Sequence, residues 1–333
     1  MPQPATNTVT TIGFTLLALI AFAANSVLCR LALGQQTIDA ASFTVLRLLS
    51  GALVLLLLLL LRANRRNKNR QQTTLPNQHQ SPSQKKGPFH KKGQKARSQA
   101  GSWLAASYLF GYAIAFSYAY NSLDTATGAL ILFGSVQLTM ISVSLYRGER
   151  LQPAEWLGLI IAFGGFVYLL LPGLTTPALQ GFVLMTLAGI AWGGYTLKGK
   201  GSSDPLADTA YNFVRTLPWL LALVITGGAL VLLSNGDASL FEQLWQGLSG
   251  KGIALAIASG ALASGIGYSL WYQALTALST SQAASVQLLV PVLAAFGGIL
   301  FVDEAVSLRL MVAALLILGG IALTVFGKRA ASV

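Results

Sequence analysis

Apolar residues fill most of this chain in long runs, and short polar segments separate one run from the next. Ten runs can be marked, each close to the ~20 residues with which a helix crosses a lipid bilayer. In hydrocarbon the backbone groups must bond within their own segment, so the pattern predicts helices rather than open strands. The predicted spans lie near 11–33, 39–61, 101–120, 124–145, 153–171, 180–200, 207–233, 252–275, 280–301 and 306–327.

Composition supports lipid as the solvent of this chain. Hydrophobic residues make up 54% of the 333 residues and charged residues 10%, whereas soluble domains carry about 25% charged residues. A soluble chain this apolar would expose large adhesive patches. The predicted fold class is therefore all-α integral membrane, with ten transmembrane helices and membrane lipid as a partner.

One segment carries half of the basic residues. Residues 62–100 hold eleven of the 22 Lys and Arg and no Asp or Glu. A basic patch can indicate nucleic-acid binding, but this one lies between two apolar spans and contains one aromatic residue, Phe89. It is rich in Gln, Asn, Ser and Pro. This composition predicts a disordered cytoplasmic loop that is dispensable for folding, and no nucleic-acid partner.

The basic residues also predict an orientation. With 62–100 in the cytoplasm, the ten spans place six further basic residues on the same side and only Lys251 in a loop on the other. Both termini are then cytoplasmic, and the expected location is the bacterial plasma (inner) membrane. The six residues are Arg147, Arg150, Lys198, Lys200, Lys328 and Arg329.

The longest loop on the other side, 234–251, has a helical spacing of apolar residues. This spacing predicts an amphipathic helix lying on the outer membrane surface, although a plain loop is the alternative. The apolar positions are Leu240, Phe241, Leu244, Trp245 and Leu248.

The chain repeats itself. Its early part aligns with a later part at a shift of 168 residues, and its middle aligns at a shift of 155. Aligned pairs are Arg30 with Lys198, Arg47 with Arg215, Ala129 with Ala284 and Glu149 with Glu304. The predicted repeats are 11–171 and 180–327, with five helices each. Five is odd, so the second repeat is inverted, an architecture that places a solute site near mid-membrane at the repeat interface.

Several short motifs identify a family. They are Ala21-Phe22-Ala23-Ala24-Asn25-Ser26, Val45-Leu46-Arg47-Leu48-Leu49, Arg147-Gly148-Glu149-Arg150-Leu151, Leu289-Val290-Pro291-Val292-Leu293, Asp303-Glu304 and Gly319-Gly320. With these motifs, the chain resembles the EamA-type members of the drug/metabolite transporter superfamily. One departure is that the family's proline in the fourth helix is Val136 here, whereas Pro291 is present in the ninth. The resemblance implies a secondary transporter that exports an amino-acid-like solute by alternating access, and leaves the solute open.

Two arginines lie within predicted spans. Arg47 is eight residues into its span, about 12 Å along a helix, and Arg215 is its repeat partner. Because a charge at a helix centre costs roughly 2.5–3.5 kcal/mol, they are candidates for binding a carboxylate or phosphate. The alternative is that they extend to the membrane surface or pair with Asp39 and Asp208.

Other polar residues fall near mid-depth. Amide and aromatic groups on a water-facing wall would suit an uncharged or zwitterionic organic solute. Alternatively, the aromatic residues belong to interface belts, as Trp103, Tyr118, Tyr120 and Tyr272 would, and the amides join neighbouring helices. The candidates are Asn25, Tyr112, Gln137, Trp192, Tyr195, Tyr268, Trp271 and Gln287.

Two of these candidates share a context. Gln137 and Gln287 both stand in the string Ser-Val-Gln-Leu. Their positions in the fourth and ninth spans put both amides roughly 10–12 Å from the cytoplasmic edge. This agreement predicts that they face one another across the solute path, as part of a gate or of the floor of the site.

The sequence excludes other classes. It has no His within a span, no metal-ligand cluster, no catalytic dyad and no carboxylate deep in a span. We therefore expect no enzyme, cofactor or metal site, and the missing carboxylate argues against proton antiport. A lipid-linked-sugar flippase or a lipid-facing scaffold is the alternative to a transporter of small solutes.

Overall fold

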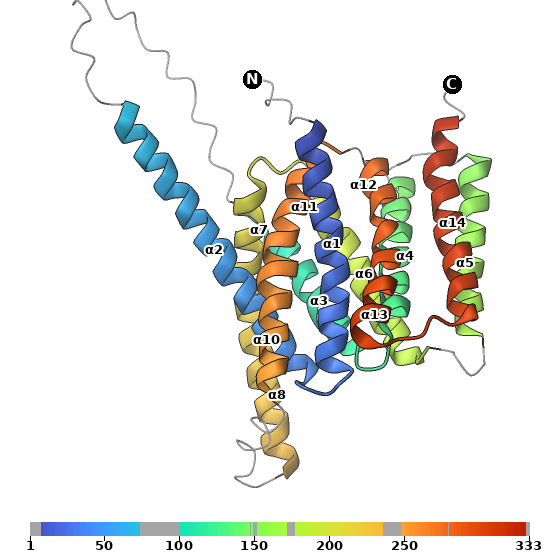
Figure 1. Ribbon diagram of the computed structural model, residues 1–333, viewed down its shortest axis with the longest axis horizontal. Coiled ribbons are helices and arrows are strands. Elements are labelled where there is room, and N and C mark those ends of the chain that lie inside the picture. The colour runs from blue at the N-terminus through green and yellow to red at the C-terminus, as the bar shows by residue number, and fades with distance from the viewer. Residues whose placement is uncertain are drawn as a thin grey trace, which may run out of the picture.

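The computed structural model describes residues 8–73, 100–146, 148, 152–171, 177–235, 248–278 and 280–330. In these residues all regular structure is helical (Figure 1). The first half contains α1 (Thr8–Leu33), α2 (Ala40–Thr73), α3 (Trp103–Ala119), α4 (Thr125–Tyr146) and α5 (Pro153–Leu170). The second half contains α6 (Leu179–Gly199), α7 (Pro205–Val214), α8 (Leu217–Asn235), α10 (Gly250–Ala258), the π-helix η1 (Ser259–Ile266), α11 (Gly267–Leu275), α12 (Thr280–Gln287), α13 (Leu289–Val302) and α14 (Leu308–Ala330).

Within the described residues these elements form ten rods, one for each predicted span, because three rods of the second half are built from consecutive pieces. They are α7 with α8, α10 with η1 and α11, and α12 with α13. Five rods are both long and apolar enough to cross a membrane by themselves. The predicted all-α membrane fold is confirmed.

Prolines explain two of the interruptions. Proline has no N–H, and its ring clashes with the carbonyl four residues earlier. Pro218 is four residues after Val214, where α7 ends, and Pro291 is four residues after Gln287, where α12 ends. The fourth rod has Val136 in place of a proline, and α4 is continuous. The departure from the family pattern therefore has the expected consequence for helix shape.

The second helix corrects one prediction. The span near 39–61 continues as α2 to Thr73 and includes the first part of the basic segment. The expected loop start at 62 is wrong because Arg, Ala, Lys and Gln are good helix formers even where they cannot bury a core. Arg62 also pairs with Asp204 at 2.6 Å, which holds this part of α2 against the start of α7.

Two predictions lie wholly or largely outside the described residues. The remainder of the basic segment, 74–99, is one of them, and the proposed surface helix is the other, since 236–247 is not described. Both stay predictions.

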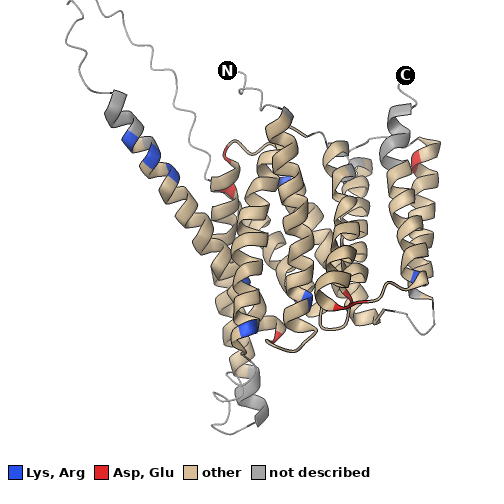
Figure 2. Cartoon of the chain, viewed as in Figure 1, with Lys and Arg blue, Asp and Glu red and all other residues tan. Residues whose placement is uncertain are grey.

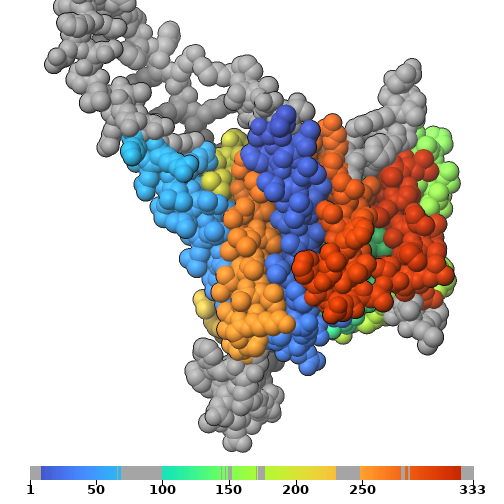
Figure 3. Space-filling view, in the orientation of Figure 1, coloured from blue at the N-terminus to red at the C-terminus, as the bar shows by residue number. Residues whose placement is uncertain are grey.

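The rods stand side by side, and both chain termini lie at one face of the bundle, which we call the terminal face (Figure 1). α1 occupies a central position and contacts α10, η1, α11, α13 and α4. Figure 3 shows it between the rod of α10 to α11 and the rod of α12 to α13. α5 and α14 pack on each other at one side of the bundle.

Polarity follows this arrangement. Large apolar side chains such as Leu300, Leu308 and Leu315 are about 70–75% exposed, as expected of surfaces that face lipid. Most charged residues gather toward the two faces (Figure 2). One arginine is instead buried among the helices, as described next.

Candidate functional site

Arg47 of α2 is 1% exposed and lies buried between α2, α3, η1 and α11. Its Nη2 donates hydrogen bonds to the phenol oxygens of Tyr112 on α3, at 2.9 Å, and Tyr268 on α11, at 2.8 Å. Its Nε donates to the Oγ atom of Ser264 on η1, at 3.0 Å. One guanidinium therefore joins elements of both repeats.

Asn25 of α1 extends this network. Its Nδ2 donates to the Tyr112 phenol oxygen at 3.0 Å, and its Oδ1 accepts from the Ser259 hydroxyl at 2.5 Å. The two phenol oxygens lie 3.0 Å apart. We call Asn25, Arg47, Tyr112, Ser259, Ser264 and Tyr268 the central polar cluster. All six residues are buried.

The π-helix explains how two serines reach this cluster. Single π-turns inside α-helices occur frequently at functional sites. At the start of η1, Gly260 lies so close to α2 that a Cβ atom there would be 2.1 Å from the Arg47 carbonyl oxygen. Glycine at this position allows α2 and η1 to touch, and the contact brings Ser259 and Ser264 to the level of Arg47.

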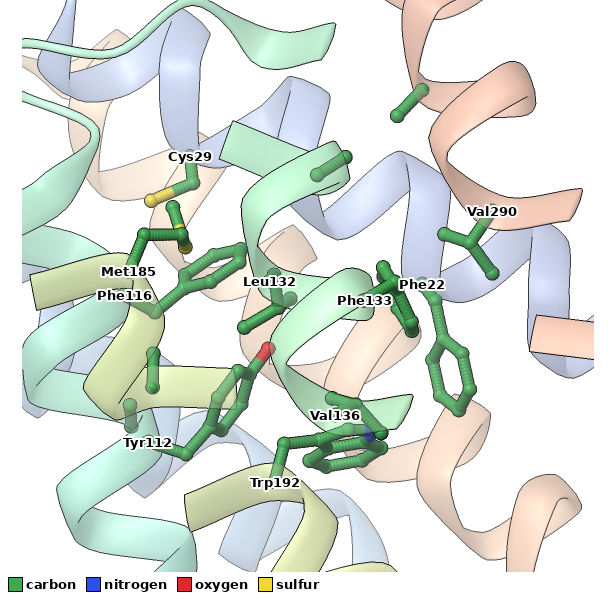
Figure 4. Packing of buried hydrophobic residues seen from close by; sticks show 14 of the residues in the cluster. Phe22, Cys29, Tyr112, Phe116, Leu132, Phe133, Val136, Met185, Trp192 and Val290 are labelled. Carbon is green, nitrogen blue, oxygen red and sulfur yellow. The ribbon is translucent and has the colours of Figure 1, made fainter. Parts of the chain in front are cut away.

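Aromatic rings border the cluster on one side. Phe22 of α1 contacts Trp192, Tyr268 and Trp271 with ring centroids 5.3, 5.8 and 5.5 Å apart. Each of these contacts is edge-to-face, an arrangement that aromatic pairs favour. Tyr112 and Trp192 lie side by side at 5.0 Å (Figure 4). Tyr195 lies 5.4 Å from Trp192 with the two rings tilted by 33°, so these rings form a continuous aromatic wall.

The two glutamines lie toward the terminal face. Both are fully buried. The Oε1 of Gln287 accepts a hydrogen bond from the Trp192 indole at 3.4 Å, and its Nε2 donates to the Ala283 carbonyl. Gln287 thus touches the aromatic wall, whereas a direct relation between Gln137 and Gln287 stays a prediction.

Arg215 is not part of the cluster. It follows α7, and its Nη1 donates to the Ala100 carbonyl at 2.7 Å, next to the start of α3. The repeat partners Arg47 and Arg215 therefore occupy unlike environments. Neither forms the predicted alternative ion pair, because Asp39 accepts from backbone amides at the start of α2 and Asp208 accepts from the Gly101 amide.

The charge of Arg47 is not neutralised. In the described part of the chain it pairs with no carboxylate, and its Nη1 has no hydrogen-bond acceptor. The rings of Tyr112 and Phe116 lie 5.1 and 4.9 Å from its Cζ, and cation–π attraction offsets part of the desolvation cost. A buried donor without an acceptor costs about 1–3 kcal/mol. The cluster is thus suited to bind an acceptor.

A separate cavity of about 310 Å³ opens at the face opposite the termini. Its lining includes Asp124 and Glu304, which both pair with Arg30 of α1. The cavity is lined by none of the residues of the central polar cluster.

The chain matches the sequence profile of the EamA-like transporter family twice, over residues 9–171 and 179–326. The chain belongs to the EamA-like transporter family. It is therefore a multi-pass membrane transporter of the drug/metabolite transporter superfamily and not an enzyme. Small-molecule solutes and a lipid environment follow from the same membership.

Two further similarities accompany this membership. The EamA-like transporter is 47% identical over 314 residues to the uncharacterized protein PA1977 of Pseudomonas aeruginosa, covering 94% of this chain and 93% of the relative. It also resembles a solved crystal structure of a protein, with 18% identity, a TM-score of 0.57 and coverage of 96% and 97% of the two chains. At that identity the likeness concerns the fold alone.

Three residues of this EamA-like transporter were not candidates from sequence. Ser259 and Ser264 looked like ordinary small residues in a Gly- and Ala-rich span, and Phe22 looked like one apolar residue among many.

The four aromatic residues expected in interface belts divide into two groups. Trp103 and Tyr118 are exposed, as a belt requires, whereas Tyr120 and Tyr272 are buried. The other mid-depth candidates are all buried.

Proposed function

We propose that this EamA-like protein is a secondary transporter that exports a small amino-acid-like metabolite by alternating access. The central polar cluster is the solute site, and the protein works in the bacterial plasma membrane with both termini cytoplasmic. The observation that carries this proposal is the hydrogen-bonded contact of Asn25 and Arg47 in one repeat with Tyr268 in the other. A solute that separates these groups would move the two repeats relative to each other.

The depth of the cluster supports the same function. Its polar groups come from α1, α2, α3, η1 and α11, and all of them are buried between the two faces. A solute path needs polar groups in the interior, since lipid offers none. The aromatic wall beside them would contact the apolar part of an organic solute. The enclosure of the cluster favours a small water-soluble solute over a lipid-linked sugar, whose tail needs a lateral opening.

The test is transport by the purified full chain in proteoliposomes. Wild-type protein is expected to show saturable uptake of at least one solute from a panel of amino acids and related metabolites, measured with and without a pH gradient. Asn25→Ala and Tyr268→Phe should reduce that uptake at least about tenfold, because each removes a bond between the repeats. Leu315→Ala, at a lipid-facing position, is the matched control.

Two results would contradict this proposal. One is uptake that both cluster variants leave at the wild-type rate while their melting temperatures are also unchanged. The other is movement of lipid-linked sugars with no transport of any solute in the panel.

A further inference from the structure

The hydrogen-bond inventory of the central polar cluster is unbalanced. A guanidinium has five N–H donors, whereas a phenol or serine oxygen has two lone pairs. Arg47 uses Nε and Nη2 on three hydroxyl oxygens, and its Nη1 has no acceptor. The Tyr112 phenol oxygen already lies within hydrogen-bond distance of Arg47, Asn25 and Tyr268. The cluster therefore has more donors than acceptors.

The charge is unbalanced in the same sense. Arg47 is the one ionised side chain among the six residues of the cluster, and the ion pairs of the described residues lie elsewhere. Buried cations in proteins are ordinarily paired with an anion. Surplus donors and an unpaired positive charge at the same atoms favour one kind of ligand, a group that is both an acceptor and an anion.

We propose that the solute of this transporter carries a single carboxylate and that Arg47 is the cation that receives it. This inference rests on the proposed function and specifies its solute class. A carboxylate on the Nη1–Nη2 edge would accept from Nη1 and replace one phenol oxygen at Nη2, in the two-bond geometry typical of arginine. The released phenol of Tyr112 or Tyr268 keeps the other phenol, 3.0 Å away, as its hydrogen-bond partner.

The surroundings favour a carboxylate over a phosphate. A phosphate ester carries up to two negative charges, and the cluster offers one cation. The neighbouring wall is aromatic, with Phe22 in contact with both Trp192 and Trp271. One cation beside a large apolar surface matches a monocarboxylate with an apolar or aromatic body.

The experiment compares carboxylates with the matching amides, in which an uncharged amide group replaces the carboxylate. The detergent-purified full chain is titrated with phenylacetate and phenylacetamide, L-leucine and L-leucinamide, and phenyl phosphate, and the shift in melting temperature is recorded. At least one carboxylate should raise the melting temperature at a concentration where its amide does not. Arg47→Gln should weaken the binding of that carboxylate by at least about tenfold.

Two further variants separate binding from folding. Arg47→Lys keeps the positive charge but loses the two-donor edge of the guanidinium. The carboxylate should therefore bind this variant more weakly than it binds wild-type protein, and still more tightly than its amide does. Arg215→Gln removes the repeat partner, which lies outside the cluster, and should leave the carboxylate preference unchanged.

Several outcomes would overturn the inference. They are equal stabilisation by amides and carboxylates, a preference for phenyl phosphate, and an unchanged carboxylate response in folded Arg47→Gln protein. Proteoliposomes that transport an amino-acid amide or another amino-acid-like solute without a carboxylate, and no carboxylate, would contradict the inference and leave the proposed function intact. Protein that binds carboxylates through Arg47 but transports nothing would contradict the proposed function instead.

Discussion

Arg30 and Glu304 are 274 residues apart in the chain, yet the Nε of one lies 3.1 Å from Oε1 of the other. The same carboxylate accepts from the Thr125 amide at 2.8 and 3.0 Å, and Arg30 reaches Asp124 at 3.2 Å. These bonds join the end of α1, the start of α4 and the segment after α13 at the face opposite the termini. We call this arrangement the Arg30 clamp.

Breaking the Arg30 clamp should open that face. Arg30→Gln removes both ion pairs, of which the one to Glu304 holds one repeat against the other where a transporter must open in one of its two states. In a Cys29→Ala background, a cysteine at Ala126, which lines the nearby cavity, should react with an impermeant maleimide severalfold faster in the Arg30→Gln protein. Because Glu304 still accepts from the Thr125 amide, the protein should stay folded, and its melting temperature is measured beside the labelling rate.

Lys251→Gln serves as the control for the clamp. Lys251 donates a hydrogen bond to Gln35, in the turn that follows α1, and contacts neither carboxylate of the clamp. It should leave the labelling rate of Ala126→Cys unchanged. Equal labelling rates in Arg30→Gln and wild-type protein would show that the clamp does not hold this face closed.

The pairing of α5 with α14 depends on Gly320. A Cβ atom at Gly320 would lie 2.5 Å from the Gly158 carbonyl oxygen and 2.6 Å from the Ala162 nitrogen, and backbone atoms cannot yield as a flexible side chain can. Gly320→Ala should therefore destabilise the protein by roughly 1–3 kcal/mol, as overpacking usually does. Thermal unfolding in detergent measures the change.

The adjacent glycine supplies the control. A Cβ atom at Gly319 would meet nothing within 4 Å. Gly319→Ala should leave stability unchanged or raise it slightly, since alanine is the better helix former by about 1 kcal/mol. If both variants behave alike, close packing at Gly320 is not what holds these two helices together.

The sequence predicted the rods well because lipid leaves little choice. An apolar run of the right length must be a helix there, and Pro218 and Pro291 mark where two rods break. The end of α2 was missed for a physical reason. The loss of apolar residues after Leu61 indicates that the chain leaves the membrane, but it does not indicate that the helix ends there.

The site was predictable only in part. Asn25, Arg47 and Tyr268 stood out because polar groups are costly in an apolar span. Ser259 and Ser264 did not, because a helix serine usually bonds a backbone carbonyl of the preceding turn, and a π-turn has no sequence signature in a Gly- and Ala-rich span. The sequence also did not predict the different environments of Arg47 and Arg215. α2 continues past Arg47, whereas α7 ends just before Arg215.

The basic residues predict the orientation of the bundle. The structure places both described ends of the chain at the terminal face, and the basic part of α2 extends outward on the same side of the bundle (Figures 1 and 2). A reporter fused after Val333 should therefore read cytoplasmic. The same reporter fused within 236–247 should read periplasmic, and a reversed pair of readings would contradict the orientation.

The basic segment beyond α2 should be dispensable. Residues 74–99 still hold six of the basic residues and no acidic one. Replacing them with an uncharged Gly/Ser linker of equal length should leave both the melting temperature and transport nearly unchanged, because this composition cannot bury a core. The basic residues from Arg62 to Arg70 remain in the variant and preserve the orientation. Loss of folded protein would show that the segment packs on the helices.

The two buried glutamines should form part of a gate toward the terminal face. α4, which carries Gln137, and α12, which carries Gln287, are in contact, and Gln287 also bonds Trp192 of the aromatic wall. An amide pair offers donors and acceptors to a passing solute without the cost of a buried charge. Gln137→Leu should accordingly slow transport severalfold, with the melting temperature maintained.

Crosslinking tests whether the pair meets. In a Cys29→Ala background, cysteines at both glutamine positions should form a disulfide in at least one conformational state, which requires the two Cα atoms to come within about 7 Å. A cysteine at Gln137 combined with one at the lipid-facing Leu315 should not crosslink. If the glutamine pair never crosslinks, with or without transported solute, and Gln137→Leu transports normally, the two amides do not gate the path and instead bond neighbouring helices.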